Sequence, residues 1–330
     1  MSTVMLESKR VIGAGIESTP YTRQTLTVSN YDFRAFNIQY SPEVEMIAHE
    51  CARGNWSKLP MIAGKRFGKV SFSTYLTSSG AAATAPDWGN FARGSSMRES
   101  VISTTGVSYI THSNYGNVPM SFEIQELEEG LSARGLVVVF VGCVGGKKII
   151  IEGVGKPIRL DYEFQGRFEI IESRTAGNVI KPAGFDTVSP NIVMGATVSV
   201  LGSTANLSKL EIDLKNQVMQ EDGFAQASGV VGYHIVDRDA PSFKLDPYLQ
   251  PLADRDFYTG WLANTTGVMS IVLSGSIPIT ISAPAMQVTK AYTPGSRNRM
   301  VSNQIEGVLT GTTAEAELRI LQGAGTEPAV

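Results

Sequence analysis

The segment DYEFQGRFEI, residues 161–170, decides the fold class of this chain. Tyrosine, phenylalanine and isoleucine occupy its even-numbered positions 162, 164, 168 and 170. Its odd-numbered positions hold Asp161, Glu163, Gln165, Arg167 and Glu169. Successive side chains of a strand point to opposite faces of the sheet, so this period of two predicts one packed and one exposed face. Similar alternation elsewhere indicates a mainly β protein of half-buried antiparallel strands.

The segment before it, residues 136–152 (LVVVFVGCVGGKKIIIE), contains two β-branched runs around the pair Gly145-Gly146. Glycine pairs supply the positive φ angles that tight hairpin turns require, so we expect a hairpin here. The sequence GCVGGKK within it has some likeness to a phosphate-binding loop. However, the early glycine is missing and a lysine replaces the magnesium-binding hydroxyl, so we prefer the hairpin.

One series of segments occurs twice along the chain. In the first half it comprises Gly68 to Leu76, Pro86 to Gly94, Gly106 to Thr111 and Tyr162 to Phe168. Its counterparts are Gly229 to Asp237, Asp256 to Thr265, Gly267 to Leu273 and Asn303 to Leu309. This order predicts a duplicated β unit in which each copy carries one short helix, around Asn90 and Trp261, after a Pro/Asp-rich stretch.

We therefore predict two tandem β-sandwich or barrel modules. A stretch rich in Gly, Pro, Thr and Asn between the halves has the composition of a linker. The predicted organisation is an N-terminal arm (1–20), a first β domain (21–173), a linker (174–190), a second β domain (191–322) and a loose tail (323–330).

Composition and motifs argue against several functions. The formal net charge of -3 gives no basic surface for gripping nucleic acid. We expect no enzymatic activity, cofactor or metal, because the chain has no Gly-X-Ser-X-Gly elbow and no recognisable ligand spacing. Cys51 and Cys143 are interpreted as buried thiols, and the acidic cluster at Glu123, Glu126, Glu128 and Glu129 as a solvated surface.

Four segments resemble the major tail tube proteins of long-tailed, non-contractile bacteriophages. They are the arm-like segment Val11 to Val28, the strand, Ser-Gly-Ala loop and Ala-Pro-X-Trp-Gly start in Gly64 to Gly89, the stretch Leu207 to Asp237, and Ile281 to Pro284. The family usually has Tyr-Gly in the arm where this chain has Pro20-Tyr21, and residues 178–205 do not align.

The resemblance implies a structural virion protein. Family members form rings that stack into a hollow tube for DNA delivery, with an inner sheet of each subunit contributing to a continuous barrel. The implied partners are other copies of the chain, the tape measure, terminator and tail-tip proteins, and DNA in transient passage, with no membrane. The location implied is the virion tail, and the absence of a signal-peptide pattern predicts synthesis in the bacterial cytoplasm without secretion. Because the chain is duplicated, three copies with pseudo-sixfold symmetry could replace six single units, although a hexamer stays open.

Two residue sets are the candidate functional positions. Residues expected to line the lumen are Asp161, Glu163, Gln165, Arg167 and Glu169, with Gln304 and Glu306 as their repeat equivalents. Plain solvent exposure on the outside is the alternative for this set. Residues expected to contact the next ring are Thr77, Ser78, Ser79 and Gly80 in the loop, with Glu17, Pro20 and Tyr21 in the arm.

Two other functions compete with the tube subunit. A tail-tip, distal or adaptor ring protein could share the same β fold. A carbohydrate-binding or adhesive β-sandwich would display exposed aromatics, whereas Trp56, Trp88 and Trp261 stand in segments that we expect to be packed.

Overall fold

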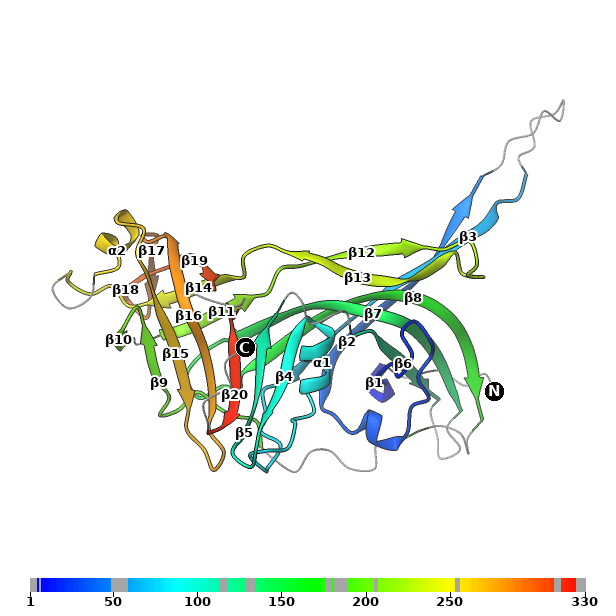
Figure 1. The fold of residues 1–330 in the computed structure, drawn as a ribbon, viewed down its shortest axis with the longest axis horizontal. Helices are drawn as coiled ribbons and strands as arrows, with labels where there is room; N and C mark the ends of the chain where they lie inside the picture. Colours follow the sequence, from blue (N-terminus) through cyan, green and yellow to red (C-terminus); the bar gives the residue numbers. More distant parts are fainter. Residues whose placement is uncertain are drawn as a thin grey trace.

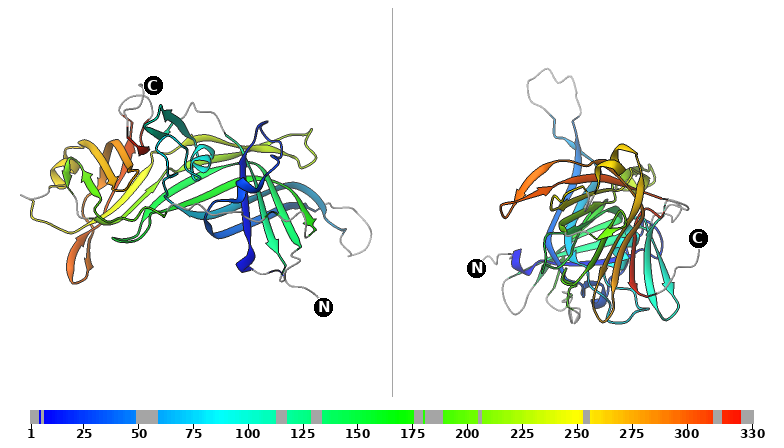
Figure 2. Two further views of the ribbon diagram at one scale, coloured as in Figure 1. Left: turned by 90° about the horizontal axis from the view of Figure 1, so that it is seen from below. Right: turned by 90° about the vertical axis from the view of Figure 1, so that its left-hand side faces the viewer.

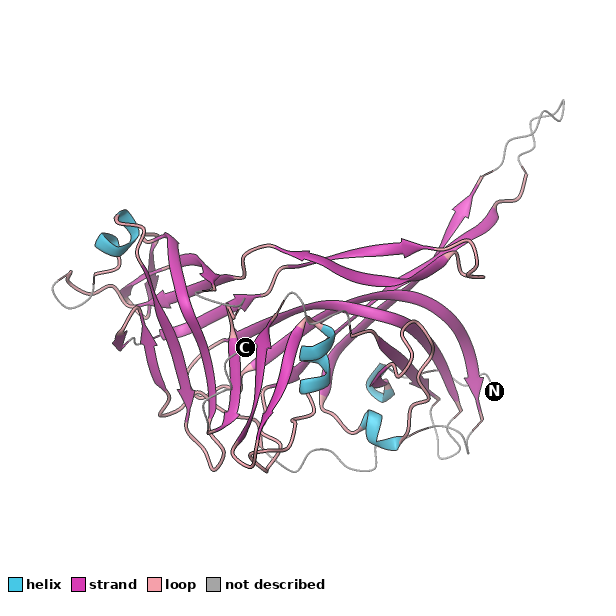
Figure 3. Cartoon of the chain, in the orientation of Figure 1, coloured by secondary structure: helices cyan, strands magenta, loops and turns pink. Residues whose placement is uncertain are grey.

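The computed structural model describes residues 5, 7–48, 59–112, 118–128, 134–175, 180, 189–204, 207–252, 256–311 and 316–324. Within these ranges the chain is mainly β, as predicted (Figure 3). The helical elements described are the short helices α1 (Gly89–Gly94) and α2 (Tyr258–Leu262) and two 3-10 turns, η1 (Glu7–Lys9) and η2 (Val28–Tyr31). Both α-helices lie where the sequence predicted them, after the Pro/Asp stretches.

The first half of the chain forms an antiparallel arrangement with the strand order β1-β6-β7-β8-β3-β2 (Figure 1). Strands β4 and β5 pair with each other, and β5 also pairs with β20 near the end of the chain. The strands are β1 (Val11–Ile16), β2 (Ala35–Ile47), β3 (Ile62–Tyr75), β4 (Met97–Ile102), β5 (Gly106–Thr111), β6 (Met120–Leu127), β7 (Gly135–Ile151) and β8 (Arg159–Arg174).

The second half has the order β9-β15-β16-β19-β14-β11, also antiparallel. Strands β12 and β13 pair with each other and prolong the β11–β14 hairpin, while β17 and β18 prolong the β16–β19 hairpin. The strands are β9 (Thr197–Val200), β10 (Ser203–Thr204), β11 (Leu207–Asp213), β12 (Asn216–Asp222), β13 (Val230–Arg238), β14 (Ser242–Pro247), β15 (Thr266–Leu273), β16 (Ile279–Lys290), β17 (Pro294–Arg297), β18 (Met300–Asn303), β19 (Ile305–Thr310) and β20 (Arg319–Gly323).

Strand pairing joins the two halves across the predicted linker. Residues 210–213 of β11 pair with residues 148–151 of β7, and β20 pairs with both β5 and β16. The two halves therefore share one sixteen-stranded sheet and one cluster of buried apolar residues. Linker residues 176–179 and 181–188 and tail residues 325–330 lie outside the described residues.

The core lies on the inner side of the large sheet, between strands β3, β6, β7 and β8 and the part of the fold that contains α1 and the sheet's own strands β4 and β5 (Figure 2). Phe91 of α1 packs edge-on against Phe72 of β3, with ring centroids 5.0 Å apart. Phe122 and Phe164 complete this aromatic group, with ring centroids 4.9 Å apart. The nearby Trp88 indole donates a hydrogen bond to the Thr77 carbonyl at 2.8 Å. Aromatic packing of this kind fixes α1 against the sheet.

The predicted hairpin at Gly145-Gly146 is wrong, because β7 continues through both glycines to Ile151. The positive φ of this region occurs instead at Gly142 (66°), where the pairing of β7 with β8 shifts register between Val141 and Val144. Gly145 is required for close packing, since a Cβ there would lie 2.1 Å from the Glu163 carbonyl oxygen. The glycines thus serve a bulge and a close approach of strands.

The alternation in residues 161–170 does not persist to the end of the segment. Tyr162 and Phe164 are buried as predicted, but Ile170 is 44% exposed and Arg167 is 6% exposed. Another register shift, between Val139 and Phe140, lies opposite this part of β8. Such a shift exchanges the faces to which the following side chains point, which accounts for the exposed Ile170. Arg167 precedes this shift and is buried against β13.

Candidate functional site

The exposed side of the continuous sheet carries alternating charges from both halves of the chain. We call this surface the polar face and define it by Asp161 and Glu163 of β8, Lys148 of β7, Glu211 and Asp213 of β11, Lys244 of β14 and Glu306 of β19. Residues directly opposite each other on paired strands point to the same side. The apolar partners between them, such as Phe164, Ile212 and Leu245, are buried on the other side.

Two rows of cross-strand partners produce the alternation of acid and base. In one row, Lys148 stands between Asp161 and Asp213. The Lys148 Nζ lies 3.0 Å from the Asp213 carboxylate, and this hydrogen bond raises the lysine pKa. In the other row, Lys244 stands between Glu211 and Glu306. Each of these lysines therefore has an acidic neighbour on both sides.

The long β12–β13 hairpin crosses part of this face, as Figure 1 shows. Val230 and Tyr233 of β13 bury themselves against Val144 of β7. Asn216 at the start of β12 donates hydrogen bonds to the carbonyls of Ser95 and Gly145. Between the hairpin and the polar face lies a depression of about 500 Å³, lined by charged residues of β7 and β8 and by Asn216 and Val218 of β12.

The structure distributes the predicted lumen residues over different environments. Asp161 and Glu163 lie on the polar face, Gln165 lines the depression, and Glu306 lies on the same face beside the exposed Gln304. Arg167 does not belong with them. It is buried, donates to the carbonyls of Val231 and Tyr21, and pairs with the half-buried Glu169. Arg167 is buried because β13 and the segment at Tyr21 cover this part of β8.

The predicted inter-ring residues are also divided. Ser79, which is half-buried, Gly80 and Pro20 reach the surface. Thr77 and Ser78 are buried, so their side chains are not available for another ring. Gln322 Nε2 holds this loop by donating to Ser79 Oγ and to the carbonyls of Ala81, Ala82 and Thr84.

Two predicted arm residues make contacts within the chain. The Glu17 carboxylate accepts hydrogen bonds from Gly142 N–H (2.7 Å), Ser121 Oγ (2.9 Å) and Tyr21 N–H (2.6 Å), while burial raises its pKa. Tyr21 lies against His234 of β13, with its hydroxyl 3.1 Å from Nδ1. In addition, residues 11–16 of the predicted arm form the mostly buried strand β1.

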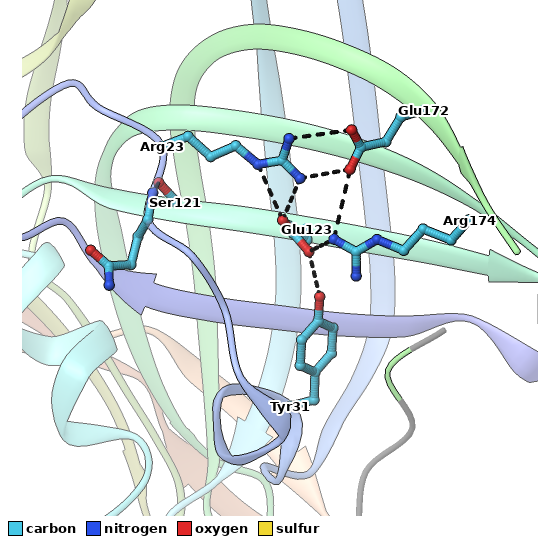
Figure 4. A network of polar contacts seen from close by, with 7 residues as sticks. Arg23, Tyr31, Ser121, Glu123, Glu172 and Arg174 are labelled. Carbon is cyan, nitrogen blue, oxygen red and sulfur yellow. Dashed lines mark hydrogen bonds and ion pairs between the residues drawn. The ribbon is translucent and has the colours of Figure 1, made fainter. Parts of the chain in front are cut away.

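A buried ionic network fastens the segment that follows the arm (Figure 4). Glu123 of β6 is 2% exposed and accepts hydrogen bonds from Tyr31 (2.6 Å), Arg174 (2.6 Å) and Arg23 (2.7 Å). Arg23 also donates to Glu172, which lowers the pKa of that carboxyl. The interpretation of this acidic cluster as a solvated surface is therefore wrong for Glu123, and also for Glu126 and Glu128, which are 7% and 9% exposed. Arginines from distant segments compensate the burial of Glu123 and Glu126, and Glu129 lies outside the described residues.

The ends of the two long hairpins expose apolar side chains that the sequence analysis did not single out. Met46 and Ile47 of β2 and Ile62 of β3 are 55%, 47% and 53% exposed. Phe224, after β12, is fully exposed. Alternation in the sequence did not single them out, because Met46 and Ile47 are adjacent. Exposed apolar side chains grouped in this way are typical of a contact surface.

Of the two cysteines, Cys143 is buried as expected, and Cys51 lies outside the described residues. Trp88 is buried and Trp261 is 37% exposed, while Trp56 is outside the described ranges. Within those ranges, no His, Cys, Asp and Glu side chains form a metal-binding group of three, and neither α-helix has the length or apolar character that crossing a bilayer requires.

Comparison of this chain with models of known protein families and with curated proteins finds no match.

Proposed function

We propose that this protein is a structural subunit that assembles with copies of itself into stacked rings forming a hollow tube, as a bacteriophage tail tube protein does. The observation that carries the proposal is the polar face, a broad sheet surface continuous across both halves in which acids and bases alternate. Sequence resemblance to the tail tube family supports the same reading.

The charge pattern suits a surface over which DNA must move without binding. Affinity for the DNA backbone comes from lysine and arginine side chains that neutralise phosphates. Lys148 and Lys244 each stand between two acidic cross-strand neighbours, so acidic groups of the protein offset the positive charge of these rows. A DNA strand passing such a surface gains little attraction at any position.

We further propose that the chain contains two copies of one module, and that three chains complete a pseudo-sixfold ring. The repeated strand order supports this: β1-β6-β7-β8-β3-β2 has its parallel in β9-β15-β16-β19-β14-β11. Segments Tyr162 to Phe168 and Asn303 to Leu309 fall on corresponding strands, β8 and β18–β19. The pair Gly106 to Thr111 and Gly267 to Leu273 does not, since β5 pairs with β4 and β20 whereas β15 pairs with β9 and β16. The pair Gly68 to Leu76 and Gly229 to Asp237 does not either, since β14 takes the place of β3 and Gly229 to Asp237 lies on β13.

Negative-stain electron microscopy of the purified protein tests the proposal. We expect hollow rods or stacks of rings, and class averages viewed along the axis should contain three chains with six similar lobes. Isolated rings that never stack would favour the tail-tip or adaptor ring. A protein that stays monomeric at all concentrations would refute the proposed function.

A further inference from the structure

The two halves of the chain are joined by the pairing of β11 with β7, which we call the internal junction. Because the strand order is repeated, this pairing predicts how two chains could pair with each other. Strand β11 occupies in the second half the place that β2 occupies in the first. Strand β16, prolonged by β17, occupies the place of β7. Inside the chain, the edge of β11 that faces away from β14 pairs antiparallel with residues 148–151 of β7.

The corresponding two edges are open. Among the described residues, β2 pairs with β3 alone and β17 pairs with β18 alone. Residues 43–47, which form the end of β2, and the following residue 48 are exposed. Pro294, Gly295 and Ser296 of β17 are exposed as well. An exposed strand edge offers unpaired N–H and C=O groups that pair readily with another strand. The chain therefore has these two open edges. The edge of β2 is equivalent to the β11 edge of the internal junction, and the edge of β17 is equivalent to its β7 edge.

The residue pairing at the internal junction predicts which residues would lie opposite each other at the open edges. The sequence repeat aligns Tyr162 with Asn303, and hence Asp161 with Ser302. Lys148 lies opposite Asp161 and Gly295 lies opposite Ser302, so Gly295 takes the place of Lys148.

The same procedure places β2. Phe164 aligns with Ile305 in the repeat, and their neighbours in β3 and β14 are Val70 and Leu245. These residues lie opposite Tyr40 and Leu210, so Tyr40 takes the place of Leu210 and Glu43 that of Asp213. Because Asp213 lies opposite Lys148 inside the chain, Glu43 falls opposite Gly295.

We infer that the open edge of β2 in one chain pairs antiparallel with the open edge of β17 in a second copy, with Glu43 opposite Gly295. This inference rests on the proposed function, since it names the edges through which tube subunits join. The contact is head-to-tail, and such contacts build a ring when the rotation between copies closes.

The backbone chemistry of the two edges fits this register. In the internal junction, the Leu214 N–H donates to the Lys147 carbonyl at 3.2 Å. Val44 takes the place of Leu214, and Pro294 that of Lys147. Proline retains the carbonyl that this bond requires. Pro42, which takes the place of Ile212, removes one donor, and a proline on each edge discourages pairing with unrelated strands.

Cysteine cross-linking tests the pairing and its register. Asp213 and Lys148 flank the bonded pair Leu214 and Lys147, so they form a non-hydrogen-bonded pair, whose Cα atoms lie about 4.5 Å apart and within disulfide range. Glu43→Cys and Gly295→Cys would be made separately in a Cys51→Ser background, mixed and oxidised. The control mixture is Ser41→Cys with Gly295→Cys, which is displaced by two residues.

We expect the Glu43→Cys and Gly295→Cys mixture to form disulfide-linked dimers about tenfold faster than the displaced control, because the diagonal pair lies about 7–8 Å apart. Equal rates in both mixtures, or dimers of Glu43→Cys alone at the same rate, would overturn the inference.

A second variant, Val44→Pro, removes the donor of the bond between the Val44 N–H and the Pro294 carbonyl. We expect self-association to weaken by up to about tenfold, the usual net worth of one hydrogen bond, while circular dichroism stays unchanged. Unchanged self-association in a folded variant would contradict the inference.

Microscopy separates failure of the inference from failure of the function. Hollow rods without the predicted cross-link would leave the tube function standing and refute these edges. Cross-linked chains that never form rods would support the edges and refute the tube.

Discussion

Lys147 offers a sharp test of the energetics of this fold, because it is a lysine buried in the core. Its side chain is 1% exposed and its Nζ lies 4.6 Å from the centre of the Trp88 ring and 3.9 Å from the Met97 sulfur. Burial lowers its pKa from 10.5 to about 7. Neutralising the lysine at pH 7 therefore costs on the order of 4 kcal/mol relative to the unfolded chain.

Replacement by methionine, Lys147→Met, removes that cost, because its side chain is apolar at every pH. The neutral lysine amine makes no cation–π contact with Trp88, so no such contact is lost with it. We expect Lys147→Met to raise the free energy of unfolding at pH 7 by up to about 4 kcal/mol.

The stability of the wild type, unlike that of the variant, depends on pH through Lys147. The folded pKa lies below the unfolded value, so the unfolded chain binds more protons between pH 7 and pH 10.5, and this contribution to stability rises with pH. The methionine variant does not have this contribution. Its advantage over the wild type should therefore shrink by about 1.4 kcal/mol per pH unit above pH 7.

Urea unfolding followed by tryptophan fluorescence at pH 7, 8 and 9 measures this difference. Lys148→Met is the matched control. Asp213 raises the pKa of Lys148, so the Lys148 side chain stays protonated from pH 7 to pH 9. A difference between Lys147→Met and wild type that stays constant from pH 7 to 9 would refute the reasoning.

Three further predictions follow from the contacts described. Glu123→Ala leaves Arg23 and Arg174 without their buried partner and should lower the free energy of unfolding by about 3 kcal/mol in urea, against less than about 0.5 kcal/mol for the exposed Glu163→Ala. The triple change Asp161→Lys, Asp213→Lys and Glu306→Lys should make assembled protein retain DNA at 50 mM salt in a filter-binding assay, whereas wild type does not, and retention that is independent of salt would contradict the electrostatic argument. Because β1 begins at Val11 and is mostly buried, deleting residues 1–8 should leave a folded subunit that forms no tubes by electron microscopy, and normal tubes would remove the arm from assembly.

Local patterns in the sequence determined the class of this fold and the positions of its helices. The alternation in residues 161–164 predicted the buried Tyr162 and Phe164, because the faces of a strand follow from its own backbone geometry. The Pro/Asp stretches likewise predicted α1 and α2. The placement of Asp161, Glu163 and Glu306 on the outward face of their strands could be predicted for the same reason.

Only the tertiary structure decided how the strands combine. Whether Gly145-Gly146 turns the chain or continues β7 depends on β8, which lies close against Gly145. The burial of Arg167 and Glu123 depends on β13, Arg23 and Arg174, which are remote in sequence. The pairing of β11 with β7, which creates the polar face, joins residues about sixty positions apart. A residue's periodicity reports its own strand, whereas strand partners and register shifts are set by the packing of distant segments, and no local pattern encodes them.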